Sequence, residues 1–335
     1  MNSKVIISIL NWNNALITIR CIESLRICGY LDNNDILIHV IDNASMEKDF
    51  YILNAYLNDK KVSFHVNSFN NGFAAGHNQI LRLACDANIE FVWLLNNDTI
   101  VQPNTLEKML HVMANDDRCG ASSPFIAYED TQHVYFLGAL QNWRSLSSYW
   151  LNAFDYENPD ASHIENIWLL GTAILVRTRA IVDVGLLDES LFAYCEDDDF
   201  GERLRLKQWR SRIVSDAVVL HGPESLANKR RPAYFYYLTA RNHTVFYLKY
   251  TPRHYRRLLR FRLIAKSVHR SHLLCQAGEK DLAHAVLVGL QDGLTGIMGE
   301  PAPAKPLALW LRVTVVFFGI ANRIHGLLQP SQQPI

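Results

Sequence analysis

The first half of the chain alternates short apolar runs with segments in which apolar residues recur at helical spacing. "KVIISIL" (4–10) is typical of a buried strand, whereas "ALITIRCIESLRICG" (15–29) has helical periodicity and ends at Gly29. Further strands are predicted at 35–45, at the start of 61–86 and at 90–101, and further helices at the end of 61–86 and at 103–116. This alternation predicts an α/β fold, with a mostly parallel sheet flanked by helices.

Polar residues stand at the ends of three predicted strands. "NWNN" follows the first strand, "DNAS" ends the second and "NND" (96–98) interrupts the fourth. The carboxyl ends of parallel strands share one edge of a sheet, and ligands bind at that edge in open α/β folds. A turn explains any one of these ends alone, but three in one register predict a ligand site.

The second half of the chain is less regular. Segment 120–165 is rich in aromatic and turn residues and gives no clear assignment. A strand and a helix are predicted within 167–192, a later strand ends at His221, and helices are predicted at 233–250 and 253–276. We therefore expect an α/β domain over residues 1–225 and a helical C-terminal region over residues 226–335.

The formal net charge of zero conceals an uneven distribution. Residues 1–224 carry 17 Lys and Arg against 29 Asp and Glu, whereas residues 225–278 carry 12 Lys and Arg and no acid. In "RHYRRLLRFRLIAKSVHR" (253–270) cations and apolar residues alternate at helical spacing, which is typical of a helix on an anionic membrane surface. The alternative is a helical pair that packs on the first domain or forms a homodimer. No nucleic-acid-binding motif accompanies the segment, so nucleic acid is not the expected partner.

Three further features bear on the compartment. The six cysteines form no CxxC pair, so neither a zinc site nor a disulfide framework is expected, and a reduced cytoplasmic location fits. The N-terminus has no apolar stretch of signal-peptide form. The apolar segment 307–324 contains Arg312 and is too short to span a bilayer, which leaves an interfacial or a core helix. We expect a peripheral protein on the inner face of the cytoplasmic membrane.

A run of four carboxylates, "EDDD" (196–199), is the strongest chemical signal. Adjacent carboxylates repel one another and resist burial, so a solvated loop or the acidic first turn of a helix is one interpretation. The other is a site that uses negative charge to hold a metal ion or to accept a proton.

The ordered motifs of residues 4–250 resemble those of glycosyltransferase family 2, which has the GT-A (Rossmann-like) nucleotide-sugar-binding fold. The bacterial rhamnosyltransferase-like branch is the most similar. The motifs are "VIISILNWNN", "VIDNAS", "NNGFAAGHNQ", "WLLNNDTIV", "LLGTAILVRTRAIVDVGLLDESLFAYCEDDDFGERL", "VVLHGPES" and "YYLTARN". The QxxRW motif of processive members is absent, which favours addition of a single sugar.

The resemblance implies a role for residues at each motif. The donor-binding residues it implies are Asn11, Asn13, Asp42, Asn71, Gly72, Asn78, Asn97 and Arg241. Three of these have a simpler interpretation as well: an Asx-turn at Asp42, a helix-starting loop at Gly72, and helix packing at Arg241. The small residues of "NNGFAAGHN" are expected where backbone passes close to the nucleotide sugar.

The resemblance also implies a metal site and a base. Asp98 and His221 would hold Mg²⁺ or Mn²⁺ against the diphosphate, although Asn96 replaces the first Asp of a strict DxD motif, and a structural histidine is the alternative at position 221. Inversion requires a carboxylate that takes the proton of the attacking hydroxyl. Asp197 is the predicted base and Glu196 the alternative. Asp199 would orient the site or pair with Arg203, which is one helical turn later.

These features predict an inverting glycosyltransferase that uses a nucleotide-diphosphate sugar. We expect dTDP-L-rhamnose as the donor, and a cell-surface glycan or lipid-linked saccharide as the acceptor. The alternatives are a galactofuranosyl- or hexosyltransferase that uses a UDP-sugar and, from another class, a non-catalytic homologue that binds nucleotide sugar. The weakened "NND" motif supports the last alternative, whereas "EDDD" and His221 argue against it.

Overall fold

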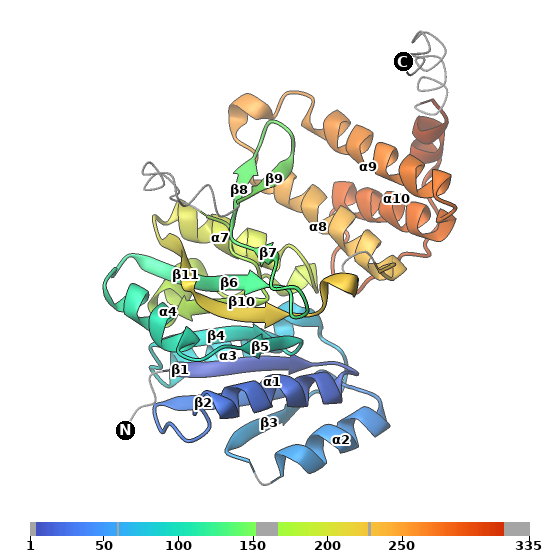
Figure 1. The fold of residues 1–335 in the computed structure, drawn as a ribbon. Coiled ribbons are helices and arrows are strands. Elements are labelled where there is room, and N and C mark those ends of the chain that lie inside the picture. Colours follow the sequence, from blue (N-terminus) through green and yellow to red (C-terminus); the bar gives the residue numbers. More distant parts are fainter. Residues whose placement is uncertain (1–4, 59, 152–166, 227–228, 318–335) are drawn as a thin grey trace, which may run out of the picture. The chain divides into compact units, whose positions relative to one another are not determined.

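The computed structural model describes residues 5–58, 60–151, 167–226 and 229–317. The chain divides into two compact units, Met1–Lys229 and Arg230–Ile335, close to the boundary expected from the sequence. The first unit contains a nine-stranded sheet with helices on both of its faces (Figure 1). The second unit is helical over its described residues.

The strand and helix bounds of the first unit follow the predicted alternation. Its strands are β1 (Val5–Asn11), β2 (Ile36–Asp42), β3 (Val62–Val66), β4 (Phe91–Asn96), β5 (Thr99–Val101), β6 (Cys119–Ala127), β7 (Val134–Phe136), β8 (Ala139–Asn142), β9 (Ser147–Trp150), β10 (Ala173–Arg177) and β11 (Arg210–His221). Its α-helices are α1 (Ala15–Ile27), α2 (Glu47–Leu57), α3 (Gly72–Asp86), α4 (Thr105–Ala114), α6 (Thr178–Val184) and α7 (Glu196–Leu206).

The sheet has a parallel half and a mixed half. Its strand order is β3-β2-β1-β4-β10-β6-β11-β5, with β7 beside β6, and β1 to β4 all run parallel. β10 is antiparallel to both of its neighbours. The predicted strand 90–101 is two strands, because the chain turns after β4 and β5 pairs with β11 instead. The unassigned segment 120–165 contributes β7 and the β8–β9 hairpin and most of β6, and its residues 152–165 lie outside the described residues.

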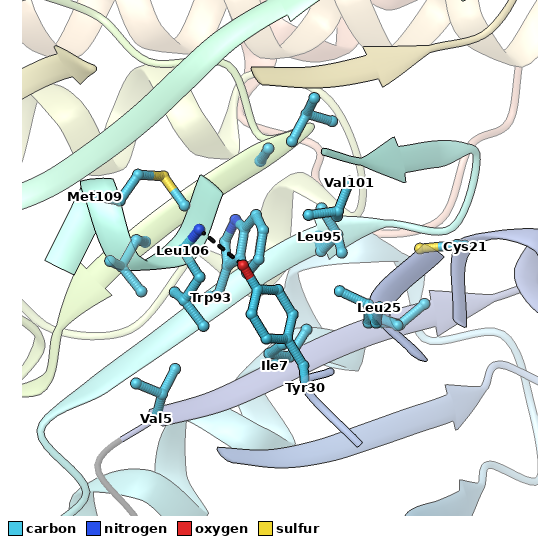
Figure 2. Close-up of a cluster of buried hydrophobic side chains, with 14 of the residues drawn as sticks. Val5, Ile7, Cys21, Leu25, Tyr30, Trp93, Leu95, Val101, Leu106 and Met109 are labelled. Carbon is cyan, nitrogen blue, oxygen red and sulfur yellow. Dashed lines mark hydrogen bonds between the residues drawn. The ribbon is translucent and has the colours of Figure 1, made fainter. Parts of the chain in front are cut away.

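Alternate residues of the strands belong to two hydrophobic clusters, one on each face of the sheet. On one face, Ile7 and Trp93 pack beneath α1 and α4, and Figure 2 shows Tyr30 among them with its hydroxyl accepting a hydrogen bond from the Leu106 amide at 3.2 Å. On the other face, residues such as Ile6 pack against α3, α6 and α7. Two-sided burial explains why β1 and β4 are almost continuously apolar. It also fixes the register that aligns their ends.

The second unit consists of α8 (Ala233–Tyr250), α9 (Leu259–Gln276) and α10 (Lys280–Thr295), and residues 309–317 are also helical. Both predicted helices, 233–250 and 253–276, are present within these bounds apart from a short 3₁₀ turn at Arg253–Tyr255. Gly289 allows α10 to approach α8, since a Cβ there would lie 3.0 Å from the carbonyl carbon of Tyr237. Among the described helices none is long and apolar enough to cross a bilayer.

Candidate functional site

The polar ends of the parallel strands meet at one edge of the sheet, as predicted. Asn11 is in register with Asp42 across the β1–β2 pair, and Leu10 is in register with Asn96 across the β1–β4 pair. The turns that follow these strands, which carry most of the predicted donor and metal residues, therefore lie side by side.

Beneath this edge Asn11 and Asp42 form a buried network. The side-chain nitrogen of Asn11 donates to Asp42 Oδ1 at 2.8 Å, to Ser45 Oγ at 3.0 Å and to Asp49 Oδ2 at 3.1 Å. Its side-chain oxygen accepts from Thr18 Oγ1 at 2.8 Å. Asp42 Oδ2 accepts from the Ser45 amide at 3.0 Å. Both side chains are almost inaccessible to solvent. The local turn expected as the simpler interpretation of Asp42 is thus present, and a nucleotide contact by either residue stays a prediction.

Asn13 follows in the left-handed region, with φ 57°. Its backbone amide donates to Ser45 Oγ at 2.8 Å, and its side-chain oxygen accepts from the backbone amide of Met46 at 2.7 Å. These contacts tie the turn after β1 to the turn after β2. Asn97 is fixed in a similar way, because its side-chain nitrogen donates to Thr18 Oγ1 of α1 at 2.9 Å.

Asn43 is a site residue that the sequence did not reveal. Its side-chain oxygen accepts from the Asn67 side chain at 3.0 Å and from the Asn71 amide at 3.1 Å, and its nitrogen donates to Asn70 Oδ1 at 2.8 Å and to the Gly72 carbonyl at 3.1 Å. Asn43 therefore joins the end of β2 to the loop before α3 and positions Asn71. The adjacent asparagines in "DNAS" and "NNG" were the available signal, but their pairing spans 28 residues.

The small residues of α3 approach other parts of the protein. Gly72 has φ +81°, and a Cβ there would lie 2.8 Å from the carbonyl carbon of Phe192 and closer still to its oxygen. A Cβ at Gly76 would lie 2.6 Å from Leu10. Asn78 is fully buried and exchanges two hydrogen bonds with the Leu187 backbone, at 2.9 and 3.1 Å. At these positions the small residues are required by contacts within the protein, and a close approach to the donor stays a prediction.

Asp98 and His221 face each other across the β5–β11 pair. His221 is in register with Thr99, and its Nε2 lies 3.2 Å from Asp98 Oδ1. Asp98 is half-exposed, His221 is largely buried against the ring of Tyr135, and His221 Nδ1 has no partner among the described residues. Two ligands bound to one cation at about 2.1 Å lie about 3 Å apart, so this oxygen and nitrogen fit a shared divalent ion.

The four carboxylates form the first turn of α7, and three of them are buried. Glu196, Asp198 and Asp199 are 5%, 8% and 4% exposed, whereas Asp197 is only partly buried. The positive end of the helix dipole favours negative charge in this turn. Asp199 pairs with Arg203 at 2.7 Å, as predicted, and Arg203 also donates to the backbone carbonyls of residues 184–186. The run is therefore the first turn of a helix, as one interpretation held, and it is not a solvated loop.

Asp197 has the properties of a proton acceptor. Its Oδ2 accepts from the Gly171 amide at 2.8 Å, and its Oδ1 accepts from the Asp198 amide at 2.9 Å. Burial, together with the charge of Asp198, raises the pKa of Asp197 to about 7 despite these two donors. Burial beside Asp197 raises the pKa of Glu196 well above its usual range, and Glu196 Oε2 has no partner among the described residues. Asp197 is the more accessible of the two carboxylates, and the choice between them as the base stays a prediction.

The segment Gly171–Thr172 joins the acidic turn to the sheet edge. Gly171 donates to Asp197, and the Thr172 carbonyl accepts from the Asn96 amide at 2.8 Å. Asp98 follows Asn96 by two residues, so the predicted base and the predicted metal ligand flank one short connection. The role of Gly171 could not be predicted from local pattern, because the contact spans 26 residues.

Arg241 lies in the second unit, apart from the other predicted donor-binding residues in the sequence. It is fully buried in α8, and it donates to the Gly299 carbonyl at 2.6 Å and to Asn242 Oδ1 at 2.8 Å. These contacts agree with its alternative interpretation as a packing residue, and a diphosphate contact stays a prediction.

Comparison with known proteins gives the family of this architecture. The family model "Glycosyl transferase family 2" matches residues 5–185, more than half of the chain. An "N-acetylglucosaminyl-diphospho-decaprenol L-rhamnosyltransferase" of Mycobacterium tuberculosis is 30% identical over 217 residues, which cover 59% of this chain and 69% of that protein.

Two solved structures share the fold at low sequence identity. S. aureus TarS 1–349 in complex with UDP-GlcNAc has a TM-score of 0.56 at 17% identity, over 88% of this chain and 81% of that one. The mannosyltransferase PcManGT from Pyrobaculum calidifontis, in complex with GDP-Man and Mn²⁺, has a TM-score of 0.55 at 13% identity, over 87% of each chain. The predicted GT-A fold is thereby confirmed.

Proposed function

The chain belongs to glycosyltransferase family 2, and we propose that it transfers one sugar with inversion from a nucleotide diphosphate to an acceptor hydroxyl. Asp197 takes the proton of that hydroxyl as its oxygen attacks the anomeric carbon. The bond between the anomeric carbon and the diphosphate oxygen breaks, and the nucleoside diphosphate leaves. The observation that carries this proposal is the partly exposed Asp197 carboxylate, which two backbone amides orient and whose pKa lies near neutrality.

Asp98 and His221 are proposed to hold a divalent cation, Mg²⁺ or Mn²⁺. The 3.2 Å separation of their ligand atoms supports this role, as does the Mn²⁺ in the PcManGT complex. Such an ion, when bound, would neutralise negative charge on the leaving diphosphate. With Asn96 in place of an aspartate, the site carries less formal charge, so we expect weak binding of the ion in the absence of donor.

For the donor and acceptor we propose dTDP-L-rhamnose and a lipid-linked saccharide of the cell envelope. The support is the 30% identity to a rhamnosyltransferase whose name specifies a diphospho-decaprenol-linked acceptor. The runner-up within the enzyme class is a UDP-sugar such as UDP-galactofuranose or a UDP-hexose, since TarS and PcManGT carry different nucleotide sugars on the same fold. The alternative of another class is a non-catalytic homologue that binds nucleotide sugar.

We further propose that the second unit attaches the protein to the inner face of the cytoplasmic membrane. Leu258 and Phe261 are 66% and 54% exposed at the start of α9. Exposed arginines surround them in the sequence, at Arg253, Arg256, Arg257 and Arg260. Exposed apolar side chains among cations suit an anionic lipid surface. Co-sedimentation with phosphatidylglycerol vesicles, but not phosphatidylcholine vesicles, tests this; binding to neither, with a dimer in solution, would favour the homodimer alternative.

A donor screen tests the enzymatic proposal. dTDP-rhamnose, UDP-galactose, UDP-glucose, UDP-galactofuranose and GDP-mannose would be tested for binding and slow hydrolysis with and without Mn²⁺. We expect Mn²⁺-dependent hydrolysis of dTDP-rhamnose. Selective use of a UDP-sugar would replace the proposed donor, and binding without hydrolysis or transfer to a polyprenyl-diphosphate saccharide would support the non-catalytic alternative.

A further inference from the structure

The turn that leads into the acidic run has an unusual backbone. Phe192, Tyr194 and Cys195 have φ values of 67°, 68° and 72°, although none is glycine. Non-glycine residues rarely adopt positive φ, and several within four positions persist only when their surroundings hold them. This turn connects Leu191 of a 3₁₀ helix to Glu196, the first residue of α7. The path of the turn therefore determines the position of Asp197.

The first turn of α3 holds this strained backbone. The Phe192 carbonyl accepts from the Phe73 amide at 2.6 Å and from the Ala74 amide at 3.3 Å. Gly72 is packed so closely against Phe192 that any side chain at position 72 would collide with its carbonyl group and with Cγ of its ring. Two of the amides that a helix N-terminus would otherwise present to an anion are thus occupied by protein.

We propose that Gly72 is a positioning residue for Asp197, acting through Phe192, and that it is not a contact of the donor sugar. This inference rests on the proposed function of Asp197. A Cβ at position 72 would lie 2.8 Å from the Phe192 carbonyl carbon, where ordinary contacts are 3.4 Å or longer. The turn would therefore be displaced, and the Gly171 and Asp198 amides would no longer meet the Asp197 carboxylate at 2.8 and 2.9 Å. Displacement of a reacting group by about 1 Å costs about 100-fold in rate.

Gly72→Ala tests the inference, with Gly29→Ala as its matched control. Gly29 has φ +79°, so both substitutions impose similar backbone strain, but a Cβ at position 29 meets nothing within 4 Å. We expect Gly72→Ala to lower kcat by about 10- to 100-fold, with the donor KM and the affinity for the nucleoside diphosphate within about two-fold of wild type. Gly29→Ala should leave kcat unchanged.

Phe192→Gly provides a second variant that is expected to fold, since glycine adopts this φ without strain. It should lower kcat in the same way, because a glycine at this position leaves the turn free to take other paths. A donor affinity that falls with kcat preserved in Gly72→Ala would overturn the proposal in favour of a donor contact. Wild-type kinetics in both variants would overturn it as well.

A readout that does not depend on activity separates this inference from the proposed function. Amide hydrogen exchange should become at least about ten-fold faster at Gly171 and Asp198 in Gly72→Ala and Phe192→Gly, and stay unchanged in Gly29→Ala. Unchanged exchange at these amides would contradict the positioning role. A wild-type protein without transferase activity would refute the proposed function, and the exchange experiment would still decide whether Gly72 holds the turn.

Discussion

Asp197→Asn is expected to remove most of the activity and yet to stabilise the protein at alkaline pH. Burial and the charge of Asp198 raise the pKa of Asp197 from 3.8 to about 7 in the folded state. The folded protein therefore binds this proton more tightly than the unfolded chain does. Below about pH 4 the group is protonated in both states and carries no penalty. Between about pH 4 and pH 7 the unfolded chain releases this proton while the folded protein retains it, so the stability falls until the group is ionised in both states.

The size of this effect follows from the pKa difference. A pKa raised from about 4 to about 7 corresponds to about 4 kcal/mol of destabilisation above pH 7. Because Asp197 is partly accessible to solvent and asparagine loses one acceptor, we expect about 2 kcal/mol of this to be recovered in Asp197→Asn. In a chain of this size that raises Tm by about 4 °C at pH 8 and by much less at pH 5.

Asp199→Asn is the matched control from the same helical turn. Asp199 is buried and paired with Arg203, so its substitution breaks an ion pair and should lower Tm at pH 8. Thermal unfolding from pH 5 to 8 and initial transfer rates would be measured for wild type and both variants. Transfer by the wild type should rise with pH up to about 7, and Asp197→Asn should lose about 10²- to 10⁴-fold in rate. A Tm loss in Asp197→Asn equal to that of Asp199→Asn at every pH would refute the reasoning.

Two further substitutions test the packing around α7. Gln208 is not a glycine and has φ 61°, so Gln208→Gly should raise the free energy of unfolding by about 0.5–1 kcal/mol in urea denaturation; a decrease would contradict the strain. Arg203→Ala removes the ion-pair partner of the buried Asp199 and a donor to three backbone carbonyls, so the same measurement should show a loss of about 3–5 kcal/mol, and a loss below about 1 kcal/mol would be inconsistent with the observed network.

The sequence predicted those parts of the fold that depend on local pattern. Apolar runs at 4–10 and 90–101 marked the central strands, and the polar residues that follow them do share one edge of the sheet. The sequence placed β4 and β5 in one predicted strand that "NND" interrupts, and only the pairing of β5 with β11 shows that the chain turns there.

The site was predictable where a single residue type carries its chemistry. Asp98 and His221 were predicted from the resemblance to the family's motifs and the acidic turn from its charge, and the structure places Asp98 beside His221. Asn43 and Gly171 were not found, since their roles depend on hydrogen bonds to segments more than twenty residues away. Likewise, a glycine that packs against Phe192 cannot be distinguished in sequence from one that faces a ligand.

We propose that Asp98 helps to bind the donor complex, whereas Asp197 performs the chemistry. The most direct test is calorimetric titration of the donor with Mn²⁺ into Asp98→Ala and Asp197→Asn, beside transfer rates for the same preparations. We expect that Asp98→Ala loses donor affinity by at least about ten-fold, and that Asp197→Asn binds the donor as wild type does while its transfer rate falls at least about 100-fold. Full transfer activity in Asp197→Asn, or unchanged Mn²⁺-dependent binding in Asp98→Ala, would contradict it.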